Sequence, residues 1–264
     1  MTDTLCNKDF PRSNKYDFQW ILDNQMGPHP LWMTEFLAQS MDLKPGMRVL
    51  DLGSGKGMTS VFLATEFNVR VCAVDFDEWE GWTSPESRWG NAKKFDVEHL
   101  VTPIKADARN LPFAKGYFDA IICVNAYFYF GAETGYLEYL LQFLRPGGQL
   151  GIIIPGYTRD ISDGKPEYMS MFDDGSCMWQ TLPWWKSLWD GSGLVGINIA
   201  DYLPSGCSLW ARWDKVLLDE AKTQQDIESH KADIEILERD NGEYIGFIRM
   251  VATKKDLRLR GLNT

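Results

Sequence analysis

The sequence has 264 residues, of which 44% are hydrophobic, and a formal net charge of −10. This length allows one large α/β domain with insertions or two small domains, and the hydrophobic content excludes a disordered chain. The sequence has no apolar run near the roughly 20 residues of a membrane helix and no signal-peptide core at its start. It also has no basic patch outside residues 254–260. We therefore expect a cytoplasmic protein that neither inserts into a membrane nor binds nucleic acid.

The five cysteines are far apart, odd in number and without a CxxC pair. Disulfide frameworks and zinc sites both need paired or closely spaced cysteines. We therefore expect free thiols in a reducing compartment and no metal site.

The segment before the first predicted strand, Tyr16–Ser40, begins with an aromatic stretch. Gly27-Pro28-His29-Pro30 then breaks any helix, and helical spacing resumes over Leu31–Met41. Residues 1–46 are therefore expected to form a cap in front of the core.

Between residues 47 and 155, short apolar runs alternate with helical stretches, which is the pattern of βαβ units around a parallel sheet. The runs are β-branched and almost continuously apolar, as are strands buried on both faces. The predicted strands are Arg48–Leu52, Val69–Val74, Val101–Lys105, Phe118–Val124 and Gln149–Ile154. The predicted helices are Met58–Phe67, Glu86–Phe95 and Glu133–Leu144, the last of them stopped by a Pro-Gly-Gly sequence.

The last third of the sequence differs in character. Residues 156–177 are polar and loop-like, Trp179–Trp189 has helical spacing, and Leu194–Tyr202 and Glu243–Thr253 have strand character. Between these two strands, Ser208–Arg239 is a long, charged helical region. We expect it either to pack over the strand ends as a lid or to extend outward as an oligomer contact.

A turn with three alternate glycines, Asp51-Leu52-Gly53-Ser54-Gly55-Lys56-Gly57, follows the first predicted strand. Glycine permits positive φ and close approach of the backbone to a ligand, and the following helix offers its N-terminal N–H groups. A dinucleotide turn would read GxGxxG, but Met58 occupies the place of that third glycine. Asp51 would repel a pyrophosphate and tolerate the ammonium of a methionine group. Taken alone, the turn is also compatible with a structural strand-to-helix connection.

Two further predicted strands end near carboxylates. Asp75 follows the glycine turn by about 20 residues, a spacing that suits hydrogen bonds to ribose hydroxyls, although it could instead cap a helix. Asp107 and Ala108 precede Leu-Pro-Phe, so the carboxylate could accept from an adenine amino group while the apolar residues flank the ring. A plain turn carboxylate is the alternative for Asp107.

Together with the segments Tyr117–Asn125 and Leu144–Leu150, these motifs resemble, in order and spacing, the class I (Rossmann-like) S-adenosylmethionine (SAM)-dependent methyltransferases. The closest resemblance is to the small-molecule branch, with the ubiquinone/menaquinone-type and amine methyltransferases, and it covers Gly27–Pro155. It implies an α/β fold with a doubly wound, mostly parallel seven-stranded sheet, an N-terminal helical segment and a lid-like insertion.

The resemblance also implies one methyltransferase domain over residues 1–264. Its parts would be the N-terminal cap segment 1–46, the SAM-binding core 47–155, and the C-terminal strands 156–264 with a helical insertion near 208–240.

The resemblance assigns roles to individual residues. Gly53, Ser54, Gly55 and Gly57 would hold the methionine part of SAM by backbone, and Asp51 would face its amino group. Asp75 would bind the ribose, with Phe76 beside the adenine. The remaining cofactor residues would be Asp107 and Ala108 at the adenine edge and Asn125 at the methyl-donor site.

Candidates for a catalytic role are few. Many relatives carry a histidine pair after the fourth strand, but here that stretch reads Tyr127-Phe128-Tyr129-Phe130. Tyr127 and Tyr129 are therefore candidates for the pocket, as is His29, while aromatic packing is an equally good account of either tyrosine. His99 and His230 are expected at the surface.

Tryptophan is abundant outside the core strands. Packing of a lid against the sheet would explain these residues, and an aromatic pocket for a flat or cationic acceptor is the alternative. The tryptophans concerned are Trp79, Trp82, Trp89, Trp179, Trp184, Trp185, Trp189, Trp210 and Trp213.

The predicted function is transfer of a methyl group from SAM, as co-substrate, to a small-molecule acceptor such as an amine or an aromatic compound. Methyl transfer from a sulfonium is an in-line displacement, in which the protein mainly supplies alignment and desolvation. The alternatives are a non-catalytic SAM-binding protein and an enzyme of the same fold with other chemistry, such as aminopropyl transfer. Both a monomer and a homodimer are compatible with the sequence.

Overall fold

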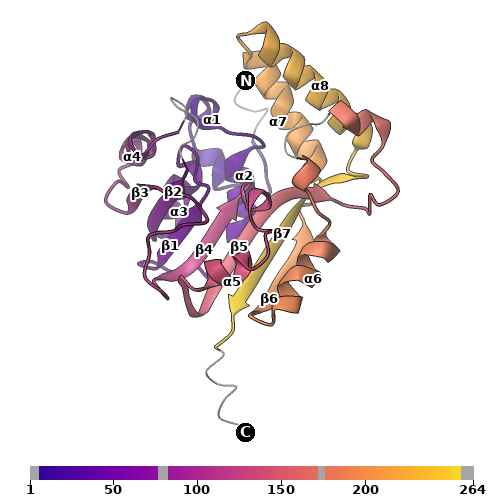
Figure 1. Ribbon diagram of the computed structural model, residues 1–264. Helices are drawn as coiled ribbons and strands as arrows, with labels where there is room; N and C mark the ends of the chain where they lie inside the picture. Colours follow the sequence, from indigo (N-terminus) through magenta and orange to yellow (C-terminus); the bar gives the residue numbers. More distant parts are fainter. Residues whose placement is uncertain (1–5, 77–82, 172–175, 257–264) are drawn as a thin grey trace.

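The computed structural model describes residues 6–76, 83–171 and 176–256. Its centre is a seven-stranded sheet in the order β3-β2-β1-β4-β5-β7-β6 (Figure 1). The strands are β1 (Arg48–Leu52), β2 (Arg70–Asp75), β3 (Val101–Lys105), β4 (Phe118–Val124), β5 (Leu144–Tyr157), β6 (Val195–Tyr202) and β7 (Ile245–Lys254). β7 runs antiparallel to both β5 and β6, and the other neighbouring pairs are parallel. The predicted doubly wound, mostly parallel sheet is confirmed.

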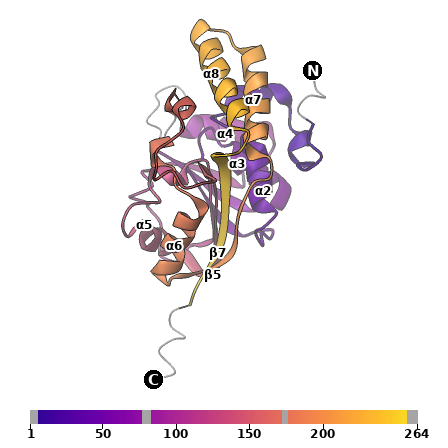
Figure 2. The same ribbon diagram turned by 90° about the vertical axis from the view of Figure 1, so that its right-hand side faces the viewer.

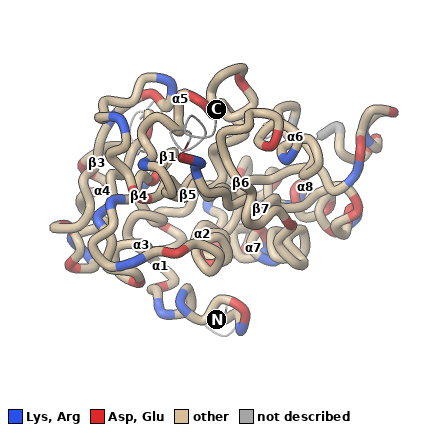
Figure 3. The backbone as a smooth tube through the Cα atoms, turned by 90° about the horizontal axis from the view of Figure 1, so that it is seen from below, with Lys and Arg blue, Asp and Glu red and all other residues tan. Residues whose placement is uncertain are grey.

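The helices cover both faces of this sheet. The α-helices are α1 (Phe18–Asn24), α2 (Pro30–Ala38), α3 (Met58–Phe67), α4 (Pro85–Lys94), α5 (Tyr136–Leu141), α6 (Leu182–Ser192), α7 (Gly206–Glu220) and α8 (Gln224–Asp240), and the short 3₁₀ helices are η2 (Ser13–Lys15), η3 (Tyr127–Tyr129), η4 (Glu167–Met171) and η5 (Ser176–Met178). Seen edge-on, α2 and α3 lie on one side of the strands and α5 and α6 on the other (Figure 2). The view from below shows the same three layers (Figure 3).

The central strands lie where apolar residues are most continuous in the sequence. Val49 and Leu50 of β1 and Ile121 and Ile122 of β4 are at most 1% exposed. Strands covered by helices on both faces need such apolar side chains in both directions. The alternation of strands and helices thus brings the carboxyl ends of β1, β2 and β4 to one edge of the sheet.

The C-terminal third forms the antiparallel edge and a helical hairpin. α7 and α8 lie between β6 and β7 in sequence and pack side by side at the end of the sheet where the parallel strands finish (Figures 1 and 2). The helical region expected over Ser208–Arg239 is present, and it consists of two helices. Extended backbone at Ala221 ends α7, and the Thr223 side chain caps α8 by accepting from Asp226 N, so the chain reverses direction between the helices.

Several other predicted bounds also differ from the structure. The helix expected over Glu133–Leu144 begins only at Tyr136, because Gly135 adopts a left-handed conformation with φ 79°. The fifth strand, expected at Gln149–Ile154, extends over Leu144–Tyr157, because β4 pairs with Leu144 at its start and β7 pairs antiparallel with its residues as far as Tyr157. In the parts of the chain that the structure describes, no helix has both the length and the apolarity to cross a membrane.

Candidate cofactor and active site

The glycine turn connects β1 to α3 in a conformation that other residues would not adopt. Gly53, Gly55 and Gly57 have φ values of 76°, 52° and 86°. A Cβ at Gly53 would collide with the Cβ of Ala126, and one at Gly55 would lie 3.0 Å from Met26 Sδ. The turn therefore needs glycine both for its backbone conformation and for its close packing.

The carboxylate of Asp75, at the end of β2, joins the glycine turn directly. Its Oδ2 accepts from Gly55 N at 2.7 Å. The N–H groups of Gly53 and Ser54 bond instead to the Val74 carbonyl, at 2.9 and 3.0 Å. The ends of β1 and β2 thus form one polar edge in which Asp75 lies beside the turn.

Asp51 is the most perturbed carboxylate in the described part of the site. It is fully buried, and its Oδ2 accepts from Ser60 Oγ on α3 at 2.5 Å. Its Oδ1 accepts no hydrogen bond from any described residue. Burial raises the pKa of Asp51 to about 7; the bond from Ser60 opposes this shift and the charge of Asp75 adds to it. A cationic ligand group would stabilise the ionised form of such a carboxylate, so the pair Asp51–Ser60 fits the ammonium of a methionine moiety.

Asn125 follows β4 with a left-handed backbone, φ 56°, which is uncommon outside glycine. A Cβ on Gly27 would lie 2.7 Å from Asn125 Nδ2, so the turn at the start of the Gly-Pro-His-Pro sequence packs closely against this amide. Such strained backbone positions gather at functional sites.

A cleft opens between the glycine turn, the end of β4 and the N-terminal segment. Gly53, Ser54, Gly55 and Lys56 line one side and Asn125 another; the Ser54 hydroxyl is buried with no hydrogen-bond partner among the described residues. The side from the N-terminal segment is mainly apolar and comprises Asn24, Met26, Pro28, Pro30 and Met33. An orphaned hydroxyl beside an apolar wall suits a ligand with both polar and apolar parts, whereas Asp51, Gly57 and Asp75 are not among the described residues that line the cleft.

Asp107 and Ala108 lie in the loop after β3 and are not among the described residues that line this cleft. Asp107 Oδ1 accepts from Arg109 N at 2.8 Å, which forms a tight turn, and the Ala108 carbonyl accepts from Tyr136 Oη at 3.1 Å. The Arg109 guanidinium also forms an ion pair with Glu133, tying the loop to the start of α5. Phe76 is 48% exposed at the end of β2. Trp79 and Trp82 lie outside the described residues.

The structure places His29 behind the cleft wall. Pro28 and Pro30 line the cleft, whereas the His29 ring stacks on Trp32 at 4.0 Å and meets the edge of Trp213 at 4.7 Å. Its Nδ1 accepts from Trp32 N at 3.3 Å, which caps α2. Burial lowers the pKa of His29 to about 3, so the imidazole is neutral at physiological pH. This geometry gives His29 a capping and packing position.

The two tyrosine candidates in η3 have different surroundings. Tyr127 is fully buried against Trp185, Trp189 and Tyr136, and burial raises the pKa of its hydroxyl far above the ordinary value. Tyr129 is 48% exposed. Neither is among the described residues that line the cleft.

The tryptophans after the parallel core lie in two groups. Trp185 and Trp189 of α6 pack on Tyr127, while Trp179 contacts Tyr157 and Trp210. These rings are buried in the described structure, as lid or helix packing requires, whereas that of Trp184 is 38% exposed.

Sequence reasoning missed Arg88, which is fully buried on α4. Its Nη1 donates to the Gly55 carbonyl at 3.1 Å and its Nη2 to the Ile104 carbonyl at 3.4 Å. Its charge lowers the pKa of Asp51, in opposition to the burial. Arg88 thus supports the glycine turn from behind, but it stands in a polar helical stretch with no local motif, so nothing in the sequence pattern distinguished it.

The sheet order, the glycine turn and the carboxylates at the strand ends together define a class I SAM-dependent methyltransferase fold. Within it, residues 49–148 match the family described as a methyltransferase domain. The match covers less than half of the chain, and this part of the chain is similar to methyltransferase domains.

Curated relatives match over the same part of the chain. The 27-O-demethylrifamycin SV methyltransferase of Amycolatopsis mediterranei is 29% identical over 120 residues, which cover 46% of this chain and 43% of that protein. The glycine/sarcosine/dimethylglycine N-methyltransferase of Actinopolyspora halophila is 25% identical over 43% of this chain and 20% of its own length. The chain thus spans less than half the length of either relative.

Solved structures match over more of the chain. The phosphoethanolamine N-methyltransferase 2 of Haemonchus contortus, in complex with SAM, has a TM-score of 0.74 at 17% identity and covers 97% of this chain and 60% of that one. A SAM-dependent methyltransferase of Thiobacillus denitrificans, in complex with S-adenosylhomocysteine, has a TM-score of 0.66 at 19% identity and covers 91% and 99%. At these identities the likeness establishes the shared fold.

Proposed function

We propose that this protein transfers a methyl group from SAM to a small-molecule acceptor by in-line displacement. The observation that carries the proposal is Asp51, a fully buried carboxylate with one unbonded oxygen, set two residues before a glycine turn that the Asp75 carboxylate joins. In the proposal, Asp51 supplies an anionic group for an ammonium, and Asp75 supplies a second one for a ribose. The family match and the fold support the same activity.

In this proposal the chain's own residues bind and align the co-substrate. The backbone of Gly53, Ser54, Gly55 and Gly57 holds the methionine part, and Asp51 faces its ammonium. Asp75 binds the ribose hydroxyls, and Phe76, Asp107 and Ala108 receive the adenine. Asn125, held in its left-handed conformation, lies next to the reacting centre. When bound, SAM supplies a methyl group carried on a sulfonium. The acceptor's lone pair forms the new bond to this methyl group as the carbon–sulfur bond breaks, and the sulfur departs as a neutral thioether.

The acceptor side of the proposal rests on the cleft wall and on His29. Met26, Pro28, Pro30 and Met33 give the cleft an apolar wall beside the glycine turn, and a less polar surrounding would aid a displacement on a cation. His29 stays neutral because of burial, and its Nδ1 is engaged in the α2 cap. These features favour an acceptor that is nucleophilic without deprotonation by His29, such as a neutral amine. The Actinopolyspora relative is named as an amine methyltransferase.

The test has two stages. Calorimetry with SAM, S-adenosylhomocysteine and NAD is expected to show binding of the first two, and binding of NAD without SAM would refute the proposal. A screen of amines, phenols and thiols with mass detection is then expected to show a gain of one methyl group in at least one class. Transfer of an aminopropyl group, or tight SAM binding with no product over the whole screen, would instead support one of the two alternative functions of this fold.

Matched variants connect the activity to the site. Asp75→Asn removes the charge beside Gly55 and is expected to weaken SAM binding by at least tenfold, since hydrogen bonds to a charged group contribute about 1.5–3 kcal/mol. Asp42→Asn makes the same chemical change at an exposed residue that pairs with Lys44, and it should leave binding unchanged.

A further inference from the structure

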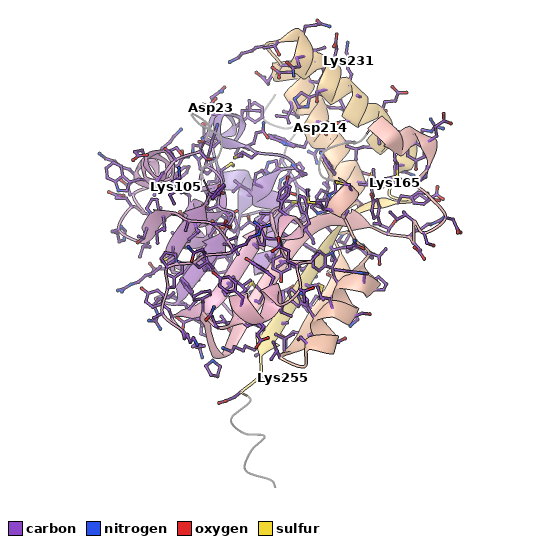
Figure 4. All side chains as sticks on the ribbon, viewed as in Figure 1. Asp23, Lys105, Lys165, Asp214, Lys231 and Lys255 are labelled. Atoms are coloured by element: carbon purple, nitrogen blue, oxygen red, sulfur yellow. The ribbon has the colours of Figure 1, made fainter. Side chains whose placement is uncertain are left out.

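A second group of metal-ligating side chains lies on the helical hairpin, outside the cleft. Asp214 of α7 and His230 and Asp233 of α8 each offer one ligand atom, and these atoms all lie within 4.8 Å of one another. We refer to these three residues as the hairpin triad. Figure 4 labels Asp214 on α7 and Lys231, the neighbour of His230, on α8, and shows the two helices side by side at this point.

The sequence places the triad on facing surfaces of two helices. His230 and Asp233 are three residues apart, so they lie on the same face of α8. Asp214 faces them from α7, and the ion pair of Lys215 with Glu238, at 2.5 Å, joins the same two helices. The three ligand atoms therefore come from elements that are already held together.

The surroundings of the triad favour a cation. Asp214 is only 4% exposed, and its Oδ1 lies 3.3 Å from His230 Nδ1. Asp233 offers a second carboxylate within 4.8 Å of the same imidazole. We expected His230 at the surface, but its side chain is only 22% exposed. That expectation was wrong because Asp214, 16 residues earlier in the sequence, packs against it only in the hairpin.

The distance between His230 and Asp214 suits a small divalent ion. Two tetrahedral ligands with metal bonds of about 2.1 Å lie about 3.4 Å apart. His230 Nδ1 and Asp214 Oδ1 are 3.3 Å apart. That nitrogen is buried, yet it makes no hydrogen bond of acceptable geometry with any described group. Asp233 is half-buried on the same helix face as His230, so a change of side-chain rotamer can bring its carboxylate closer.

We propose that Asp214, His230 and Asp233 bind a divalent transition metal ion such as Zn²⁺ between α7 and α8. One imidazole and two carboxylates form a three-ligand set that leaves a coordination position for water, and imidazole favours transition metals over Ca²⁺ or Mg²⁺. Cysteine spacing, which predicted no metal site, carries no information about a site made from these ligands.

The bound ion would fix the hairpin relative to the cleft wall. Trp213, next to Asp214, donates from Nε1 to the Gly27 carbonyl at 3.2 Å, and Gly27 packs against Asn125. A metal that clamps α7 to α8 therefore stabilises the helix that supports the Gly-Pro-His-Pro turn. The ion acts on the fold of the hairpin and takes no part in methyl transfer.

The test uses the full chain with Cys6 and Cys177, the exposed thiols among the described cysteines, changed to serine so that they cannot bind the probe. After treatment with EDTA and its removal, Zn²⁺ is titrated by calorimetry, and melting is followed with and without the ion. We expect one bound equivalent and a higher Tm with Zn²⁺. His230→Gln and Asp233→Asn, both at incompletely buried positions, should each weaken Zn²⁺ binding by at least tenfold and abolish the rise in Tm.

Two control variants test whether the effect is specific. Glu235→Gln alters an exposed carboxylate of the same helix, and His99→Gln removes an exposed histidine far from it in sequence. Both should bind Zn²⁺ as the parent does. Melting in EDTA shows whether each variant folds. Equal Zn²⁺ binding by the parent and by folded His230→Gln, or no binding by the parent, would overturn the proposal and leave the triad as an ion pair between two helices.

Discussion

Asp51 offers the sharpest test of the proposed site, because its burial should make the protein respond to pH in a defined way. In the folded protein without ligand the pKa of Asp51 is raised to about 7 from an ordinary value of 3.8. The folded state thus binds this proton more tightly than the unfolded chain does. The contribution of Asp51 to stability is therefore fully present below about pH 4 and is lost as pH rises towards and through 7.

The magnitude follows from the two pKa values. Between about pH 5 and pH 8 the ionisation of Asp51 should lower the free energy of unfolding by about 2.5 kcal/mol. Asn at this position cannot ionise, but its amide oxygen can still accept from Ser60 Oγ. Asp51→Asn should therefore lack this part of the pH dependence. Since the ligand's ammonium prefers the ionised carboxylate, SAM affinity of the parent should fall more than tenfold between about pH 7 and pH 5, and Asp51→Asn should bind SAM weakly at both.

The first assay is urea unfolding of the ligand-free parent and of Asp51→Asn at about pH 5 and pH 8. Asp42→Asn serves as an exposed control. Calorimetry with SAM then measures binding by the same proteins. Comparing the variants cancels the titration of all other groups. If the parent and Asp51→Asn lose the same stability between the two pH values, Asp51 is not a buried carboxylate of raised pKa. If Asp51→Asn binds SAM as the parent does, the role assigned to Asp51 is wrong.

Three other substitutions test the packing around the site. Gly53→Ala combines positive φ with a collision against Ala126, so it should abolish measurable SAM binding. Its control, Gly46→Ala, has φ 82° but no neighbour within 4 Å. Gly46→Ala should cost only about 1 kcal/mol of stability in a denaturant titration. His29→Asn can still cap α2 but loses the ring contacts with Trp32 and Trp213, so it should lower Tm while leaving the pH profile of kcat unchanged. Loss of the acidic limb of that profile would instead make His29 a base. Trp185→Leu should lower the free energy of unfolding by about 2–4 kcal/mol with acceptor KM unchanged, because this ring is fully buried against Tyr127, and a raised KM would place it in the acceptor pocket.

Several features follow from the sequence because they depend on short-range patterns. The predicted bounds of β1, β3, β4 and α3 are those of the structure, since continuous β-branched runs and a glycine turn specify strand, turn and helix locally. The GxGxG spacing likewise distinguishes this turn from dinucleotide turns, because the positions of the glycines are a property of the sequence alone. The sequence by itself thus determined the fold class and one edge of the site.

Long-range contacts decided the rest. The length of β5 depends on antiparallel pairing with β7, about a hundred residues later in the chain. His29 became a buried cap because Trp213 of α7 packs on it, and the raised pKa of Asp51 depends on burial and on Asp75. Burial, charge pairing and strand pairing join residues that are distant in sequence, so no local pattern encodes them. Tertiary structure therefore determined which polar groups face the cleft, which are tied up in packing, and which gather on the hairpin.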